Sequence, residues 1–250
     1  MSDWFTTTDM GGGVARLMLH RAPVNALNPA FLDALGAEYD RLGADSSVRA
    51  VVLGSDLKVL SGGLDLKEAQ GFDLQGQWDI VRALNESFTK LYALPKPTIA
   101  AINGAAIAGG FFFVIGCDYR VTHERVSFGL AEVRVGATLP FGPLELARAE
   151  LSAADMRRLL LNGQPIRAEA ALASGIVDEI VAADAVMDRA LDLAAQYAAL
   201  PPKTYAASKA DLRGTTVQRI ETAMQNGANT PKGGWFSDET KTAMAAMLAG

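Results

Sequence analysis

The stretch Pro97–Asp118 reads PTIAAINGAAIAGGFFFVIGCD and joins a short apolar strand, a turn and a second apolar segment. The pair Asn103-Gly104 is typical of a turn, because both residue types tolerate a positive φ. After Gly109-Gly110 the apolar run is long enough for a buried helix. A helix that begins there directs unpaired N–H groups at one spot, which suits an anion or a developing oxyanion. Tight packing is the alternative use of these glycines, and this stretch alone leaves both open.

A similar arrangement lies earlier in the chain. Ala50–Gly54 is a continuous apolar strand of the kind that parallel sheets bury. It is followed by a second glycine pair, Gly62-Gly63, which leads into a helical segment. Helical spacing also predicts helices from the N-cap Asn28 to about residue 42 and over Gln77–Leu94. Strands and helices therefore alternate, which predicts an α/β fold with right-handed crossovers.

The two ends of the chain differ from this central pattern. Two strands around Gly11–Gly13 predict a hairpin between Trp4 and His20. From Pro140 onward helical patterns dominate, and Pro201-Pro202 marks a boundary before a region, 203–250, that reads as all-helical. Further short strands are expected at Asp118–Thr122, Val126–Gly129 and Ile176–Val181.

The composition excludes several classes of protein. Half of the 250 residues are hydrophobic and 20% are charged, so a sizeable core is expected and broad disorder is not. A net charge of −5 argues against nucleic acid or an anionic membrane as partner. Cys117 is the single cysteine, which excludes an intrachain disulfide and, with only two histidines, argues against a structural zinc site, so no metal is expected.

We expect a cytoplasmic protein without a membrane span. A lone cysteine indicates a reducing compartment. The N-terminus Met1–Trp4 has neither a basic nor an apolar signal region. The apolar run at 97–117 is interrupted by Asn103 and by glycines, which favours a buried strand, turn and helix over a membrane helix.

Two strand-to-helix glycine loops in one chain suggest a shared chemical role. Two backbone N–H groups that converge on one oxygen form an oxyanion hole, which stabilises an enolate-like transition state. Leu64 and Gly109 are the candidate donors, and Glu132 is the best candidate for an acid or base beside them. Burial among apolar neighbours would raise the pKa of that carboxyl towards catalytic use. The alternative is a solvated glutamate at the end of a strand, and the local pattern alone favours it.

Other signatures of catalysis are missing or weak. The chain has no Gly-x-Ser-x-Gly, no Gly-x4-Gly-Lys-Ser/Thr and no Gly-x-Gly-x-x-Gly, which disfavours a serine hydrolase, a nucleotide triphosphatase and a dinucleotide enzyme. We interpret His123 as a solvated turn residue and Cys117 as an inert buried thiol. Asp65 is expected to orient its loop.

Five segments, in order and spacing, resemble the crotonase (enoyl-CoA hydratase/isomerase) superfamily over nearly the whole chain. They are Arg21–Leu27, Leu60–Leu66, Asn103–Gly110, Cys117–Arg120 and Phe128–Glu132 with Gly136. The resemblance implies a ββα-spiral core over residues 1–200 that binds acyl-CoA, and a helical oligomerisation region over 201–250 that forms a homotrimer or a hexamer. It implies a coenzyme A thioester as ligand and no separate cofactor. It also implies oxyanion donors at Leu64 and Gly109, and substrate contacts at Ala22, Val24, Gly62, Gly63, Asp65, Leu66, Phe112 and Ala131.

One departure from the family pattern bears on the reaction. Hydratases of this family carry a glutamate where this chain has Phe112, and their second glutamate corresponds to Glu132. Hydration needs a water held by two carboxylates, and a phenyl ring cannot accept that hydrogen bond. One glutamate can still move a proton from C2 to C4 of a 3-enoyl thioester, as in the Δ3,Δ2-enoyl-CoA isomerase branch. Those isomerases have an asparagine where this chain has Ala131.

The expected function is therefore conversion of 3-enoyl-CoA to trans-2-enoyl-CoA. A hydratase or another crotonase-type reaction is the first alternative, with a second polar group from Asp65, Glu68 or the loop at 70–80. A non-catalytic acyl-CoA binder is the second alternative. Candidates for the phosphates of coenzyme A are Arg21, Lys58 and Lys67.

Overall fold

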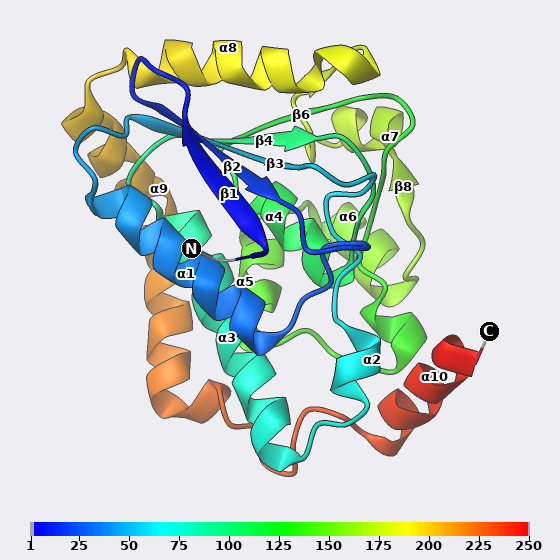
Figure 1. The fold of residues 1–250 in the computed structure, drawn as a ribbon. Coiled ribbons are helices and arrows are strands. Elements are labelled where there is room, and N and C mark those ends of the chain that lie inside the picture. Colours follow the sequence, from blue (N-terminus) through cyan, green and yellow to red (C-terminus); the bar gives the residue numbers. More distant parts are fainter. Residues whose placement is uncertain (1–2, 250) are drawn as a thin grey trace.

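A computed structural model describes residues 3–249, and its main sheet has the strand order β1-β2-β3-β4-β6-β9 (Figure 1). The strands are β1 Phe5–Asp9, β2 Val14–Leu19, β3 Ala50–Ser55, β4 Thr98–Ile102, β6 Tyr119–Thr122 and β9 Glu179–Ile180. The hairpin β1-β2 is antiparallel, as predicted, and every other pair is parallel. Met1 and Ser2, part of the segment without a visible signal, and Gly250, the expected last residue of the helical region, lie outside the described residues.

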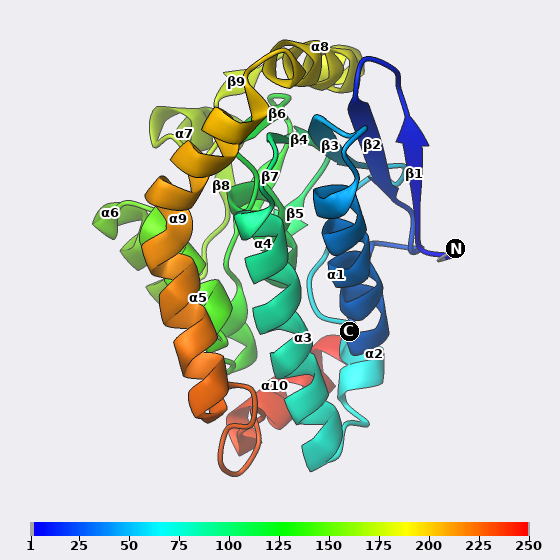
Figure 2. The same cartoon turned by 90° about the vertical axis from the view of Figure 1, so that its left-hand side faces the viewer.

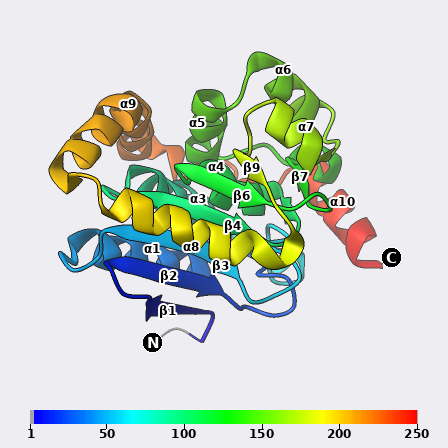
Figure 3. The ribbon, with the colours of Figure 1, turned by 90° about the horizontal axis from the view of Figure 1, so that it is seen from above.

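Strand residues alternate between two apolar cores, one on each face of the main sheet. Val52 and Ile99 pack beneath α8 (Val186–Ala198), whereas Val51 and Leu53 pack against the helices of the other face. Those helices are α1 (Pro29–Ala44) and α3 (Leu74–Ala93). Figure 3 shows α8 lying across the strands with α1 and α3 beneath them. Burial on both faces explains why these strands are continuously apolar.

A second, smaller sheet brings the loops of the main sheet together. Its strands are β5 Ala106–Ile107, β7 Ser127–Gly129 and β8 Ile166–Arg167, in that order. Single bridges join Ser61 to Ala106 and Leu27 to Leu64. The segments that follow β2, β3 and β4 therefore meet at one place, although they are far apart in sequence.

The C-terminal half is mostly helical, but not throughout. Its helices are α5 Phe141–Glu150, α6 Ala153–Met156, η3 Arg157–Leu161, α7 Ala168–Ala173, η4 Ala183–Ala185, α8, α9 Pro202–Ala223, η5 Met224–Ala228 and α10 Asp238–Ala249. Figure 2 shows α9 running beside α3 and α5. The prediction of an all-helical 203–250 is wrong for residues 229–237, where Gly233 and Gly234 have positive φ and the chain turns back. Consequently α10 returns to the core and packs near α2 (Leu66–Ala69).

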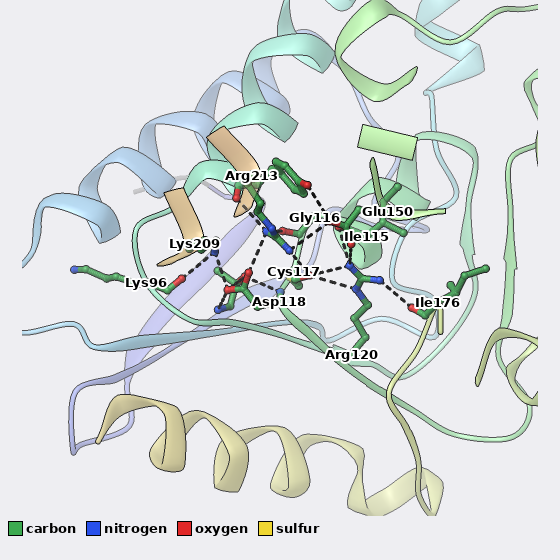
Figure 4. Close-up of polar contacts among 12 residues, drawn as sticks. Lys96, Ile115, Gly116, Cys117, Asp118, Arg120, Glu150, Ile176, Lys209 and Arg213 are labelled. Atoms are coloured by element: carbon green, nitrogen blue, oxygen red, sulfur yellow. Dashed lines mark hydrogen bonds and ion pairs between the residues drawn. The ribbon is translucent and has the colours of Figure 1, made fainter. Parts of the chain in front are cut away.

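Buried charges join α9 to the core (Figure 4). Asp118 accepts an ion pair from Lys209 at 2.7 Å and from Arg213 at 3.0 Å, and all three side chains are largely buried. Arg213 also donates to the carbonyl oxygens of Gly116 and Cys117. Cys117 is fully buried, as predicted, and burial raises the pKa of its thiol to about 12.

His123 corrects one prediction. It is only 8% exposed rather than solvated, and its Nε2 lies 3.1 Å from the Asn103 carbonyl oxygen. The turn at 124–125 is exposed, but parallel pairing of β4 with β6 places the two strand ends side by side. The ring therefore joins two neighbouring loops, a contact between distant residues that a local pattern does not predict.

Candidate active site

The two glycine loops meet at Gly63. Its φ is +86°, and a Cβ there would lie 2.9 Å from the Ile107 carbonyl oxygen and 3.3 Å from the Gly109 nitrogen. From the other side, the Leu27 N–H donates to the Gly63 carbonyl at 2.8 Å. Only glycine fits both this backbone conformation and this approach. The structure thus brings the segments around Leu64 and Gly109 together.

Two N–H groups at this junction lack acceptors. Within residues 3–249, neither the Leu64 N–H nor the Gly109 N–H donates a hydrogen bond to a protein atom. Gly109 lies in the first turn of the 3₁₀ helix η1 (Ala108–Phe111), where N–H groups have no partner in the helix. Both residues line the same cavity. The arrangement can therefore donate two hydrogen bonds to a bound oxygen.

The helix behind Gly109 is shorter than the apolar run predicts. After η1 comes a single turn, α4 (Phe112–Ile115), which ends at Gly116. A Cβ on Gly116 would lie 2.7 Å from the Phe112 carbonyl and 2.9 Å from Leu91, so the chain packs tightly here before it enters β6. The unpaired N–H of Gly109 therefore belongs to a short turn and not to a long helix.

Glu132 begins the 3₁₀ helix η2 (Glu132–Val135), and its side chain is enclosed. The residue is 7% exposed, which overturns the alternative of a solvated glutamate. Its Oε2 is buried without a hydrogen-bond partner in the described part of the chain. Burial raises the pKa of this carboxyl to about 7, against a smaller opposing effect of its own backbone N–H. A carboxylate that titrates near neutrality can both accept and return a proton.

The cavity around Glu132 has a volume of about 130 Å³ and a mostly apolar lining. Among its lining residues only Glu132 has an ionisable side chain. Phe112, at the position of the missing glutamate, is 1% exposed, and its ring centre lies 5.4 Å from that of Phe88. Other lining residues are Leu27, Gly62, Leu64, Leu66, Leu84, Gly109, Ala131, Leu139, Pro143, Trp235 and Met247. Gly63 shapes the junction but does not line the cavity.

Among the residues that the structure describes, no second acidic side chain lines this cavity. Asp65 caps α2 by accepting from the Glu68 N–H, and it pairs with Arg21 at 3.0 Å, so it orients its loop as predicted. Glu68 also pairs with Arg21 at 3.6 Å. Neither carboxylate is among the lining residues, nor is any residue of 70–80, which was expected to be a loop but is helical from Leu74 onward. Within residues 3–249, no cluster of three or more His, Cys, Asp or Glu side chains could hold a metal ion.

An open groove of about 620 Å³ adjoins the cavity, because Leu64 and Leu66 line both. Ala22, Val24 and Asp65 line the groove, as do Trp4, His20, Arg21 and Lys67. Arg21 is engaged by Asp65 and by the Ala26 carbonyl, whereas Lys67 is exposed. Lys58 does not line the groove, which makes it a poor candidate for contacting a ligand there.

Sequence reasoning missed much of the apolar cavity wall, and the two missed residues most distant from the predicted site in the sequence are Trp235 and Met247. They lie in the region that the sequence assigned to oligomerisation. The signal that could have indicated the first is an aromatic pair directly after Gly233-Gly234, since a glycine pair allows the chain to reverse. No helix within the described range 3–249 is both long enough and apolar enough to cross a membrane.

Comparisons with known proteins identify the family of this chain. A family model described as enoyl-CoA hydratase/isomerase matches residues 9–246. Mitochondrial enoyl-CoA delta isomerase 1 of Homo sapiens is 34% identical over 220 residues, 86% of this chain and 72% of that protein. A probable enoyl-CoA hydratase of Mycobacterium tuberculosis is 34% identical over 202 residues, 80% of this chain and 77% of that protein.

Solved structures give the same result. The crystal structure of human mitochondrial Δ3-Δ2-enoyl-CoA isomerase matches with a TM-score of 0.89 and 30% identity, covering 99% of this chain and 97% of that one. An enoyl-CoA isomerase from M. tuberculosis matches with a TM-score of 0.83 and 31% identity, covering 90% and 98%. The predicted resemblance and fold class are confirmed. The chain belongs to the enoyl-CoA hydratase/isomerase family and has the crotonase fold.

Proposed function

We propose that this enzyme shifts a double bond, converting 3-enoyl-CoA to trans-2-enoyl-CoA. The observation that carries the proposal is the lone carboxylate in the cavity, Glu132, with the apolar ring of Phe112 where a hydratase of the family has its other glutamate. Isomerisation needs one base that also returns the proton, whereas adding water needs a polar site that holds it. The human relative named as an isomerase supports the same choice.

In the proposed mechanism, Glu132 takes a proton from C2 of the substrate. The C–H electron pair forms a C1–C2 double bond, and the carbonyl π electrons move onto the thioester oxygen, which becomes negatively charged. The free N–H groups of Leu64 and Gly109 donate to that oxygen, which lowers the barrier because they are already oriented. Glu132 then delivers the proton to C4. When the carbonyl re-forms, the C1–C2 pair becomes the C2–C3 double bond and the C3–C4 pair takes up the proton at C4. The apolar wall around Phe112 and Ala131 keeps water from competing for the proton.

We propose that the groove receives the coenzyme A part of the substrate. Ala22, Val24, Asp65 and Leu66 lie along it, and Lys67 offers a charge to a phosphate. Gly62, together with Phe112 and Ala131, would face the acyl part inside the cavity. The reaction as proposed needs no cofactor or metal beyond the thioester itself.

A paired assay tests the function. One sample receives a 3-enoyl-CoA and the other a trans-2-enoyl-CoA, and the absorbance of the conjugated thioester is followed in both. We expect a rise in the first and no fall in the second. Glu132→Gln should lower kcat about a thousandfold while acyl-CoA binding persists. The exposed Glu221→Gln is the matched control and should retain full activity.

Other outcomes would assign other functions. A fall in the second sample would mean that water is added, as the hydratase names among the relatives allow. Binding without change in either sample would favour another thioester reaction or the non-catalytic binder. Retained activity in the Gln variant would remove Glu132 from its role. Three expectations stay predictions. They are the boundary at residue 200 between the acyl-CoA-binding core and the oligomerisation region, assembly as a homotrimer or hexamer, and a cytoplasmic location.

A further inference from the structure

Part of the cavity wall comes from the C-terminal segment. On the core side, Leu27, Leu84 and Phe112 are at most 5% exposed, so the surrounding core fixes their positions. On the other side, Trp235 is partly buried and Met247 is 57% exposed. Figures 1 and 2 both place α10 beside α2 at the same end of the molecule. On this side, Trp235 and Met247 contribute the C-terminal part of the boundary between cavity and solvent.

Trp235 is held at two points. Oε1 of the buried Gln77, in α3, accepts the backbone N–H groups of both Trp235 and Phe236 at 2.9 Å. The indole Nε1 donates to the Thr138 carbonyl at 2.9 Å, on the loop that follows η2. The backbone and the ring are therefore both fixed, which defines where the indole stands relative to Glu132.

The local backbone is shaped for this contact. Gly233 and Gly234 have φ of +79° and +89°, a conformation that other residues rarely adopt. A Cβ on Gly234 would overlap Oε1 of Gln77. The glycine pair thus allows the chain to pass close enough for the Gln77 amide to capture the residues that follow it.

Other side chains also anchor the segment. Phe236 and Met244 are at most 6% exposed and form a small apolar cluster with Ala69. Those two side chains secure the segment to α2. Trp235 packs against this cluster, with its ring centre 5.2 Å from that of Phe236, and against the main core, but unlike Phe236 and Met244 it also lines the cavity.

We propose that Trp235 limits the length of the acyl chain that the cavity accepts, and that Gln77 is the positioning residue that sets the place of the indole. The inference rests on the proposed function only in putting the acyl group of a thioester into this cavity. A shortened side chain at 235 would open the wall, and a longer acyl chain could then extend beyond it.

Binding of saturated thioesters tests this without any turnover. Isothermal titration calorimetry with butanoyl-, hexanoyl-, octanoyl- and decanoyl-CoA gives an affinity for each chain length. Each buried methylene should increase affinity about fourfold until the chain meets the indole, after which affinity levels off or falls. In Trp235→Ala the increase should continue, so that the ratio of affinities for the longest and shortest chains rises at least about tenfold.

The variants at Gln77 test the positioning role. Gln77→Leu removes the acceptor and should shift the chain-length preference in the direction of Trp235→Ala. Gln77→Glu keeps an acceptor oxygen and should retain the wild-type preference. Trp235→Phe keeps a ring and should shift it less than alanine does. Leu212→Ala, on an exposed position of α9, is the control and should match the wild type.

Two results would overturn the inference. If folded Trp235→Ala and Trp235→Phe follow the wild-type chain-length dependence, the indole does not set the limit, while the proposed isomerisation is untouched. If the wild type binds none of the four thioesters, both this inference and the proposed function fail. Near-ultraviolet circular dichroism confirms that each variant is folded before its affinities are compared.

Discussion

At the scale of single residues, burial of the Glu132 carboxyl affects both its proposed role as a base and the stability of the fold. Its carboxyl is enclosed, and burial raises its pKa from 4.5 to about 7. The folded protein therefore holds this proton more tightly than the unfolded chain does. Protonation of Glu132 stabilises the folded state fully below about pH 4.5, and that contribution is lost as the pH rises through 7. The protein thus carries a stability cost at the pH where the proposed base is ionised.

Replacing this carboxyl by an amide should therefore stabilise the protein at neutral and alkaline pH. We expect Glu132→Gln to have a free energy of unfolding up to about 3 kcal/mol above the wild type near pH 8, and equal to it near pH 4. Urea unfolding at a series of pH values measures the difference. Glu221→Gln, on an exposed position, should show no such trend. A constant difference across the series would contradict burial as the cause.

The sequence around Glu132 could not decide its exposure. Leu130 and Val133 both suggest an apolar environment, yet Leu130 is fully buried and Val133 is 48% exposed. What encloses the carboxyl is a set of side chains that are distant in sequence, such as Phe112 and Trp235. Burial at this position is a tertiary property, so the local sequence could name Glu132 as a candidate base and state the effect of burial on its pKa without deciding whether it is buried.

At the scale of elements, the site depends on the approach of two loops. Gly63 and Gly110 allow it, because a Cβ on Gly63 would lie 2.9 Å from the Ile107 carbonyl, and one on Gly110 would lie 2.7 Å from Cβ of Ser61. Residues with a side chain at either position would push the loops apart. Since the proposed hydrogen bonds come from one loop each, separation would weaken both.

Gly63→Ala should therefore lower kcat about a hundredfold or more, the typical effect of losing one oxyanion donor. It should also destabilise the protein by about 1–3 kcal/mol, because φ at this position is +86°. Steady-state kinetics and urea unfolding give the two values. Gly214→Ala is the matched control: a Cβ there meets nothing within 4 Å in helix α9, so activity should be unchanged and stability equal or higher. If Gly63→Ala kept the wild-type kcat, catalysis would not depend on the close contact between the two loops.

At the scale of the whole molecule, the alternation of strands and helices was predictable from the sequence. The contacts between distant segments that complete the cavity were not. Continuous apolar strands such as Ala50–Ser55 and the N-cap Asn28 follow from local chemistry, and both are present. The return of α10 to the cavity was not predicted. It depends on Gln77 meeting the backbone of Trp235, a contact across most of the chain that no periodic pattern encodes. The site is therefore assembled from regions that look independent in the sequence.

The buried charges that join α9 to the core form a contact of the same kind (Figure 4). Lys209 and Arg213 lie on α9, and Asp118 lies where the chain enters β6. Both cationic side chains are only 6% exposed, so water cannot replace the carboxylate as their partner. Arg213 also holds the carbonyls at the end of α4, whose preceding turn contains Gly109. The contacts that hold α9 to the core therefore extend to the short helix that follows the proposed oxyanion donor Gly109.

Asp118→Asn should weaken the whole fold, because it leaves the buried Lys209 without its countercharge and leaves Arg213 with only the more distant Glu150, at 3.8 Å. We expect a loss of about 3–5 kcal/mol in the free energy of unfolding, measured in urea at fixed protein concentration. Lys90→Ala is the control: its ion pair with Asp40 is as short, at 2.6 Å, but both side chains are exposed, so the loss should stay below about 1 kcal/mol. Hydrogen exchange should show faster exchange in α9 of the Asn variant before global unfolding. Equal losses in the two variants would mean that burial does not set the strength of this connection, and that α9 is held by its apolar packing against α3 and α5 instead.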